Sequence, residues 1–112
     1  MTEQSRGGPD PRLVAEYADR IESEMRAIAL WQESPLDPAQ FNFVEAFATD
    51  TMAFPQWLQF VFLPRVRESS RTGTFPPSSQ VGAQAVREFD GFWEASELND
   101  LLSKFDALFH EA

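Results

Sequence analysis

The sequence predicts an all-α fold, a single small bundle of about four helices packed around one central apolar helix. The span 52–63 carries only two polar side chains, Gln56 and Gln59, so nearly every face of a helix there must be covered. Other segments are amphipathic, with apolar residues recurring every three or four positions. Loop-forming dipeptides are too few for the regularly spaced strands of a β fold. Together these three observations favour a helical bundle.

Length and composition agree with one domain. The chain has 112 residues and 43% hydrophobic content, which suffices for one core. It has no cysteine, which excludes disulfides, thiol chemistry and cysteine-ligated metal. The apolar span is shorter than the about 20 residues that cross a bilayer, and the polar first residues resemble neither a signal peptide nor an anchor. We therefore expect a cytoplasmic protein that does not contact membranes.

The beginning of the chain predicts a leader followed by a helix. Residues 1–9 are polar and contain glycine, which predicts a disordered segment ahead of a helical domain at 10–112. The first helix is expected over 11–32, because Asp10 can cap it and Pro11 suits its first position. Its inward face is expected to consist of Leu13, Val14, Tyr17, Ile21, Met25 and Ile28.

A long Phe-rich connection between the first and second helices is expected at 33–50. Its phenylalanines and Val44 are not typical of a solvated loop. We expect Phe41, Phe43 and Phe47 to cover the core, with a helical turn near 44–48. An exposed adhesive patch is the alternative.

The central helix should run from about 51 to 70. Asp50 or Thr51 can cap its first turn, and Pro55 fits within that turn without losing a hydrogen bond. Pro64 lacks the N–H that would bond the carbonyl four residues earlier. We therefore expect a kink there, or a stop and restart.

Two further helices are expected over 79–90 and from about 94–96 to 110. Ser78 or Ser79 can cap the first of them, whereas Gly82 weakens this prediction. The residues expected to face inward are Val81, Ala85, Val86 and Phe89 in the first, and Leu98, Leu101, Leu102, Phe105, Leu108 and Phe109 in the second.

The middle and the end of the chain carry a recognisable pattern. An aromatic residue is followed by Asp-Thr-Met, by Gln-Trp-Leu-Gln with two apolar residues, and by Pro-Arg; a leucine-rich helix ends the chain. The residues are Phe47, Asp50, Thr51, Met52, Gln56, Trp57, Leu58, Gln59, Phe60, Val61, Pro64 and Arg65, with Phe105-Asp106-Ala107-Leu108-Phe109 departing slightly from the family's ending. This pattern resembles the YqcC-like family of small uncharacterised bacterial proteins. The resemblance implies an all-α bundle without a known active site, and a link by gene association to tRNA pseudouridine synthase C.

The polar residues of the central helix form a candidate site. Gln56 and Gln59 lie three residues apart and so share one face of the helix. A buried amide without a partner costs about 1–3 kcal/mol, so we expect the pair to tie the helix to the Phe-rich connection or to the gap left by the proline. The alternative is a polar floor in a small pocket. Asp50, Thr51 and Trp57 complete this candidate pocket or family motif, with core packing favoured for Trp57.

Arg65, Arg67 and Arg71 form a basic strip in a chain whose net charge is −9. Such a strip is either solvated, or paired with Glu68 and with carboxylates of the last helix, or it docks a partner. The acidic total repels a phosphate backbone, so we do not expect direct nucleic-acid binding.

The sequence contains no recognisable catalytic constellation. His110 is the only histidine, and a favourable contact with a helix dipole explains it there. Asp37, Glu45 and Asp50 lack the spacing of a calcium loop. We therefore expect no enzyme, cofactor or metal site, but a protein-interaction or accessory module, with a tRNA pseudouridine synthase as a candidate partner. The alternative is a small-ligand-binding domain with a pocket between the central helix and the Phe-rich connection.

Overall fold

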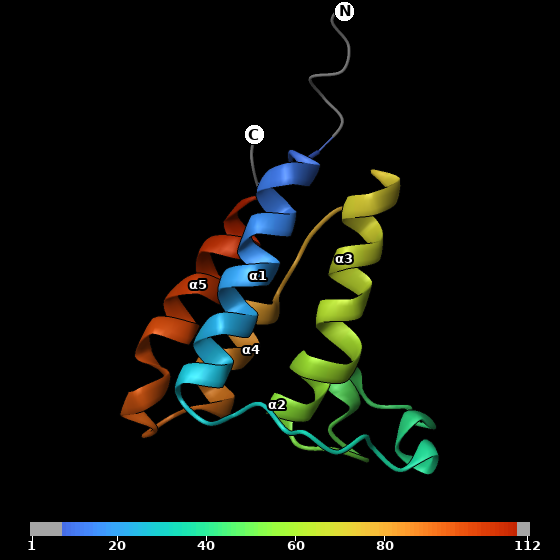
Figure 1. Ribbon diagram of the computed structural model, residues 1–112, viewed down its shortest axis with the longest axis vertical. Helices are drawn as coiled ribbons and strands as arrows, with labels where there is room; N and C mark the ends of the chain where they lie inside the picture. The colour runs from blue at the N-terminus through green and yellow to red at the C-terminus, as the bar shows by residue number, and fades with distance from the viewer. Residues whose placement is uncertain (1–7, 110–112) are drawn as a thin grey trace, which may run out of the picture.

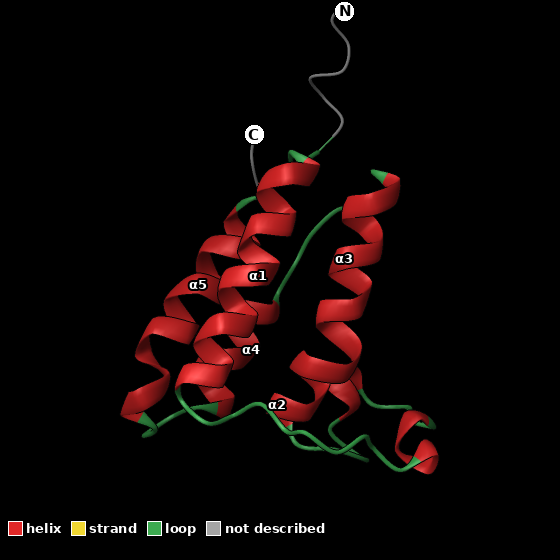
Figure 2. Ribbon diagram, viewed as in Figure 1, coloured by secondary structure: helices red, strands yellow, loops and turns green. Residues whose placement is uncertain are grey.

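Helices account for most of the chain that the computed structural model describes, residues 8–109; residues 1–7 of the predicted leader lie outside it. The α-helices are α1 (Pro11–Ala27), α2 (Phe54–Trp57), α3 (Leu63–Thr72), α4 (Val81–Glu88) and α5 (Ser96–Ala107). A π-helical segment, η4 (Leu58–Phe62), joins α2 to α3, and short 3-10 turns form η2 (Pro38–Phe41), η3 (Ala46–Ala48) and η5 (Trp93–Ala95). Figure 2 shows no strand in the described part, which confirms the predicted all-α fold. Within residues 8–109, no helix has the length and apolar character needed to cross a membrane.

The bundle is built on α1, which packs against both α3 and α5, while α4 packs against α5 (Figure 1). Residues 28–53 leave the end of α1 and run along one end of the bundle before the chain enters α2. The core is formed where α1, the central helix and α5 meet. Its fully buried large side chains are Val14, Ile21, Met25, Leu58, Leu63, Leu98 and Leu102.

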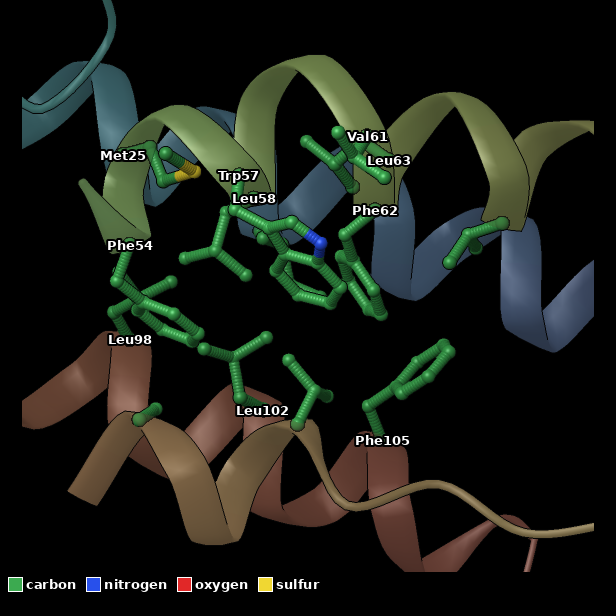
Figure 3. Packing of buried hydrophobic residues seen from close by; sticks show 14 of the residues in the cluster. Met25, Phe54, Trp57, Leu58, Val61, Phe62, Leu63, Leu98, Leu102 and Phe105 are labelled. Atoms are coloured by element: carbon green, nitrogen blue, oxygen red, sulfur yellow. The ribbon is translucent and has the colours of Figure 1, made fainter. Parts of the chain in front are cut away.

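The predicted central helix is one continuous path through α2, η4 and α3. Its rings at Phe54, Trp57 and Phe62 are buried, with Trp57 only 8% exposed, and Phe60 is partly buried. Figure 3 shows Trp57 and Phe62 pointing from this helix towards Leu102 and Phe105 of α5. The ring centres of Trp57 and Phe62 lie 5.5 Å apart, and those of Phe62 and Phe105 lie 5.2 Å apart. Burial of such rings removes about 150–250 Å² each from water, which makes this layer the main support of the bundle.

The central helix neither stops nor restarts at Pro64, contrary to one of the two predicted outcomes. In the π-type turn before it, the Leu63 N–H donates to the Leu58 carbonyl, five residues back instead of four. This turn contains one more residue than an α-helical turn, so the hydrogen-bond register shifts just before Pro64, which has no N–H to donate. The irregularity therefore lies in the turn that precedes the proline.

The first helix ends at Ala27 instead of near residue 32, so its predicted end was wrong. Ala29 adopts a left-handed backbone with a φ of 62°, and the Leu30 N–H donates to the Met25 carbonyl at 2.8 Å. These two features form a Schellman motif, which usually has glycine at the left-handed position. Because alanine stands there, no residue type marked the end of this helix.

The two predicted helix starts in the first half of the chain have different outcomes. Asp10 caps α1 as predicted, because its carboxylate accepts a first-turn N–H at 3.0 Å. Asp50 and Thr51 do not cap the central helix, since Ala53 occupies the N-cap position of α2. Gln56 supplies the acceptor there, with its Oε1 bonded to the Ala53 N–H at 2.9 Å.

The start of α4 is capped from another helix and not by the serines before it. Asp106 of α5 accepts the N–H groups of Val81 at 3.0 Å and Gly82 at 2.8 Å, and the Ser79 hydroxyl at 2.6 Å. Gly82 permits this close approach, because a Cβ there would lie 2.6 Å from the Cα of Ser103. The glycine that weakened the prediction of this helix is therefore required by its packing on α5.

The Phe-rich connection covers the core at only some of its aromatic positions. Phe47 packs edge-on against Trp57 with ring centres 5.0 Å apart, and Phe43 is partly buried. Phe41 is 46% exposed, so the expectation that it covers the core was wrong; Val44 is 86% exposed. The predicted helical turn is η3. Two residues expected to face inward from helices are also exposed: Leu13 and Val86.

Candidate functional site

Both glutamines of the central helix bond to Gln32, which precedes the Phe-rich connection. Gln59 is buried; its Oε1 accepts the Gln32 N–H at 2.9 Å and its Nε2 donates to the Gln32 carbonyl at 2.8 Å. Gln56 donates from its Nε2 to the Gln32 Oε1 at 3.1 Å. The amides therefore fasten the chain after α1 to the central helix.

Asp50 and Thr51 organise the connection. The Asp50 carboxylate accepts the N–H groups of Val44 at 3.0 Å and Glu45 at 3.3 Å, and the Val44 bond holds the pKa of Asp50 below its ordinary value. Thr51 donates from its Oγ1 to the Gln40 carbonyl at 2.6 Å, and Gln40 returns a bond from Nε2 to the Thr51 carbonyl at 3.1 Å. These contacts close the loop on itself.

Trp57 reaches a different place from the two glutamines. It lines a cavity of about 160 Å³ bounded by α1, α3, α5 and the loop after α3. Neither Gln56 nor Gln59 belongs to the lining, whereas Arg65 does. The structure therefore does not bring the predicted pocket residues together around this cavity. Its main apolar lining comes from Trp57, Phe62, Val66, Phe75, Phe105 and Phe109.

Two of the three arginines in the predicted basic strip are held in ion pairs. Arg67 contacts Asp19 at 3.2 Å and Glu22 at 3.0 Å, so it joins α3 to α1 and not, as had been expected, to the last helix. Arg71 pairs with Glu68, and this hydrogen bond lowers the pKa of the Glu68 carboxyl and raises the pKa of Arg71. The strip is therefore no continuous positive face, because neighbouring carboxylates compensate much of its charge.

An exposed aromatic patch lies where α4 ends and α5 begins. Trp93 is 73% exposed and Val86 is 55% exposed, and both line a shallow hollow that also includes Asp90 and Asn99. We call these four residues the Trp93 patch. The Oδ1 atom of Asn99 is buried and has no hydrogen-bond partner within residues 8–109. An unpaired buried acceptor costs about 1–3 kcal/mol, so this atom lowers the local stability of the start of α5.

Sequence reasoning missed this patch, although one signal for it was present. Val81, Ala85 and Phe89 follow one another at intervals of four and are buried, and Val86 falls outside that register. Trp93 lies two residues after Gly91, a glycine with positive φ, and so falls outside the helical periodicity that predicts inward positions.

The remaining titratable candidates within residues 8–109 form no metal-ligand group. Across the described ranges, no group of three or more His, Asp or Glu side chains is placed to hold a metal ion. Asp37 instead caps η2 by accepting the Ala39 N–H at 3.1 Å. His110 lies outside the described residues.

Comparison with known proteins gives consistent matches. A family model, DUF446, described as tRNA pseudouridine synthase C, matches residues 13–108. A Haemophilus influenzae protein described as uncharacterized is 30% identical over 93 residues, which cover 83% of this chain and 86% of that protein. A tRNA pseudouridine synthase C of Pectobacterium carotovorum subsp. carotovorum is 46% identical over 46 residues, which are 41% of this chain but only 12% of that protein. The solution NMR structure of YqcC from E. coli has a TM-score of 0.81 at 25% identity, covering 92% of this chain and 90% of that one.

Proposed function

The chain belongs to the DUF446 family, and we propose that it is a cytoplasmic protein-interaction module, without catalysis of its own, that docks on a tRNA pseudouridine synthase. The observation that carries the proposal is the exposure of Trp93, at 73%, beside Val86. Tryptophan is rarely left in water, and it is enriched among the residues that dominate binding energy at protein interfaces. The Trp93 patch is therefore the proposed docking surface.

The charge around the Trp93 patch specifies the kind of partner. Asp90 lines the hollow and Glu94 follows Trp93 directly; both are exposed, and neither has an ion-pair partner in the part of the chain that the structure describes. An enzyme that binds tRNA needs positive surface to hold phosphates. An apolar anchor flanked by carboxylates is complementary to such a surface.

The Pectobacterium match supports a physical link to the synthase. There, a segment of similar sequence forms 12% of a longer chain described as tRNA pseudouridine synthase C. Placing two units on one chain gives them a high effective concentration, so weak docking between them becomes favourable. We infer that the present chain makes the same kind of contact from a separate polypeptide.

The test is a titration of the purified chain against the purified tRNA pseudouridine synthase C of the same organism. Trp93→Ala should weaken binding by about 10-fold or more, as expected for an interface anchor. Val44→Ala is the matched control, because Val44 is 86% exposed in the Phe-rich connection and lies outside the patch. Both variants should keep the thermal melting temperature of the parent chain.

Two results would contradict the proposal. The first is an absence of binding by the parent chain at concentrations of about 100 μM, where even weak transient complexes form. The second is equal affinity of Trp93→Ala and the parent. The Arg65, Arg67 and Arg71 strip is a second docking candidate; because its charge is largely compensated, Arg67→Ala with Arg71→Ala should change the affinity little.

Direct RNA binding is the competing function, and it has a distinct signature. It would require affinity of the isolated chain for tRNA that falls steeply with salt. The ion pairs of Arg67 and Arg71 and the net charge of −9 oppose such binding. We propose that any contact with RNA is made by the partner.

A further inference from the structure

The cavity beside Trp57 has the size and lining of a small-molecule site. It has a volume of about 160 Å³ and lies between Val14 of α1, Val66 of α3, Phe105 of α5 and Phe75 of the loop after α3. Its walls are mostly apolar and aromatic. An engineered apolar cavity of about 150 Å³ in another protein binds benzene, so a space of this size admits a single ring.

One charged side chain distinguishes this cavity from a simple packing defect. Arg65 is the only charged residue in the lining within residues 8–109, and it makes no hydrogen bond or ion pair within that range. Its neighbours Arg67 and Arg71 are both paired with carboxylates. In a chain with twice as many acidic as basic side chains, 18 against 9, an unpaired arginine beside an apolar space is a distinctive feature.

We propose that this cavity binds a small carboxylic acid with one aromatic ring or a short branched apolar group. The apolar part packs against the aromatic lining, which includes Trp57, Phe62 and Phe105, and the carboxylate stays at the mouth and accepts hydrogen bonds from Arg65. Arginine suits this role because its planar group can bond both oxygens of a carboxylate. Ser69 and Ser78, also in the lining, add hydroxyl donors to the cavity wall. This site is separate from the Trp93 patch and does not depend on the proposed partner.

Phenylacetate is a suitable probe, and phenylacetamide is its uncharged analogue. A ligand of this size in a small pocket is expected to bind with a Kd of about 1 mM or tighter. Nitrogen-15 spectra of the full chain report the site directly, because each of its three tryptophans gives one indole signal. Trp57 lines the cavity, whereas Trp31 and Trp93 do not. Phenylacetate should therefore shift the Trp57 signal and leave the other two in place.

Two matched variants separate the proposed site from non-specific apolar binding. Arg65→Gln should weaken phenylacetate binding about 10-fold and leave phenylacetamide binding unchanged, since only the acid uses the charge. Arg71→Gln, on the same helix but outside the lining, should bind both probes as the parent does. Both changes are at exposed positions, and thermal melts should confirm that the variants fold.

The outcomes are decisive in both directions. Equal affinity for the acid and the amide, or an unchanged affinity of Arg65→Gln for phenylacetate, would overturn the assignment of Arg65. Shifts of all three indole signals together would indicate non-specific association and overturn the site. An unchanged chemical shift of the Trp57 indole signal at about 10 mM phenylacetate, well above the expected Kd, would also overturn the site.

Discussion

Apolar side chains hold the helical bundle together, whereas residues 28–53, the Phe-rich connection and its flanks, combine buried apolar side chains with side-chain hydrogen bonds to the backbone. In the bundle, side chains such as Leu58, Leu98 and Leu102 are fully buried. In the connection, Asp50 bonds to two backbone N–H groups and Thr51 exchanges bonds with Gln40. The two regions should therefore respond differently to mutation. Truncation of a buried apolar side chain should lower the free energy of unfolding of the whole chain. Loss of a polar side chain should first increase local opening of the connection.

The largest effect is expected for Trp57→Ala, which acts on the bundle. The side chain is 8% exposed and packs against Phe47, Phe54 and Phe62. Its truncation should lower the free energy of unfolding by about 3–5 kcal/mol, as large aromatic truncations in cores do. Urea denaturation followed by circular dichroism measures this change. A loss of only a few tenths of a kcal/mol would show that the aromatic layer does not support the bundle.

An intermediate effect is expected at the joint between the two regions. Gln59→Met keeps the size of the side chain but leaves the N–H and carbonyl of Gln32 without partners, which should cost about 1–2 kcal/mol. Gln56→Met is the matched control, because its bonds reach the Gln32 side chain and the exposed Ala53 N–H, and it should cost less. Equal losses for the two variants would contradict the assignment of Gln59 as the principal fastener. Measuring hydrogen exchange of the Gln32 amide in the two variants shows whether the loss of stability arises at this contact.

The smallest effect is a pH dependence confined to the connection. The Val44 N–H lowers the pKa of Asp50 in the folded chain below the unfolded value of about 3.9. A group of this kind contributes stability above its unfolded pKa, and the contribution is lost as the pH falls through the folded pKa. The amide signals of Val44 and Glu45 should therefore move below about pH 4 in nuclear magnetic resonance spectra.

Asp50→Asn provides the control for this pH dependence. In that variant the two amide signals should lose the movement below pH 4. Unchanged titration of both signals in Asp50→Asn would assign the effect to another group.

The sequence predicted the bundle better than the connection, because burial follows a helical period and local hydrogen bonds do not. The central helix and α5 were recognised from their apolar residues, and the resemblance at 47–65 pointed to the family to which the chain belongs. The end of α1 was missed because Ala29 adopts a backbone conformation that its residue type does not favour. The cap of α4 was missed because Asp106 reaches it from another helix.

Among the site residues, too, some roles could be predicted from local sequence and others could not. Gln59 was expected to bond to the Phe-rich connection or to the gap at the proline, since a buried amide requires partners, and its observed partner is Gln32, just before the connection. The Trp93 patch was not predicted, because an aromatic residue in a short turn between helices has no periodic context that reveals its exposure. The pairing of Arg67 with α1 depends on how two helices pack, and a single helical face does not contain that information.

Hydrogen–deuterium exchange of the chain, alone and with saturating tRNA pseudouridine synthase C, tests the proposed docking surface most directly. We predict that protection will appear in peptides spanning 84–99, which contain the Trp93 patch, and that peptides of the connection at 37–53 will exchange as before. Protection confined to another face, or no protection at saturation, would contradict the account.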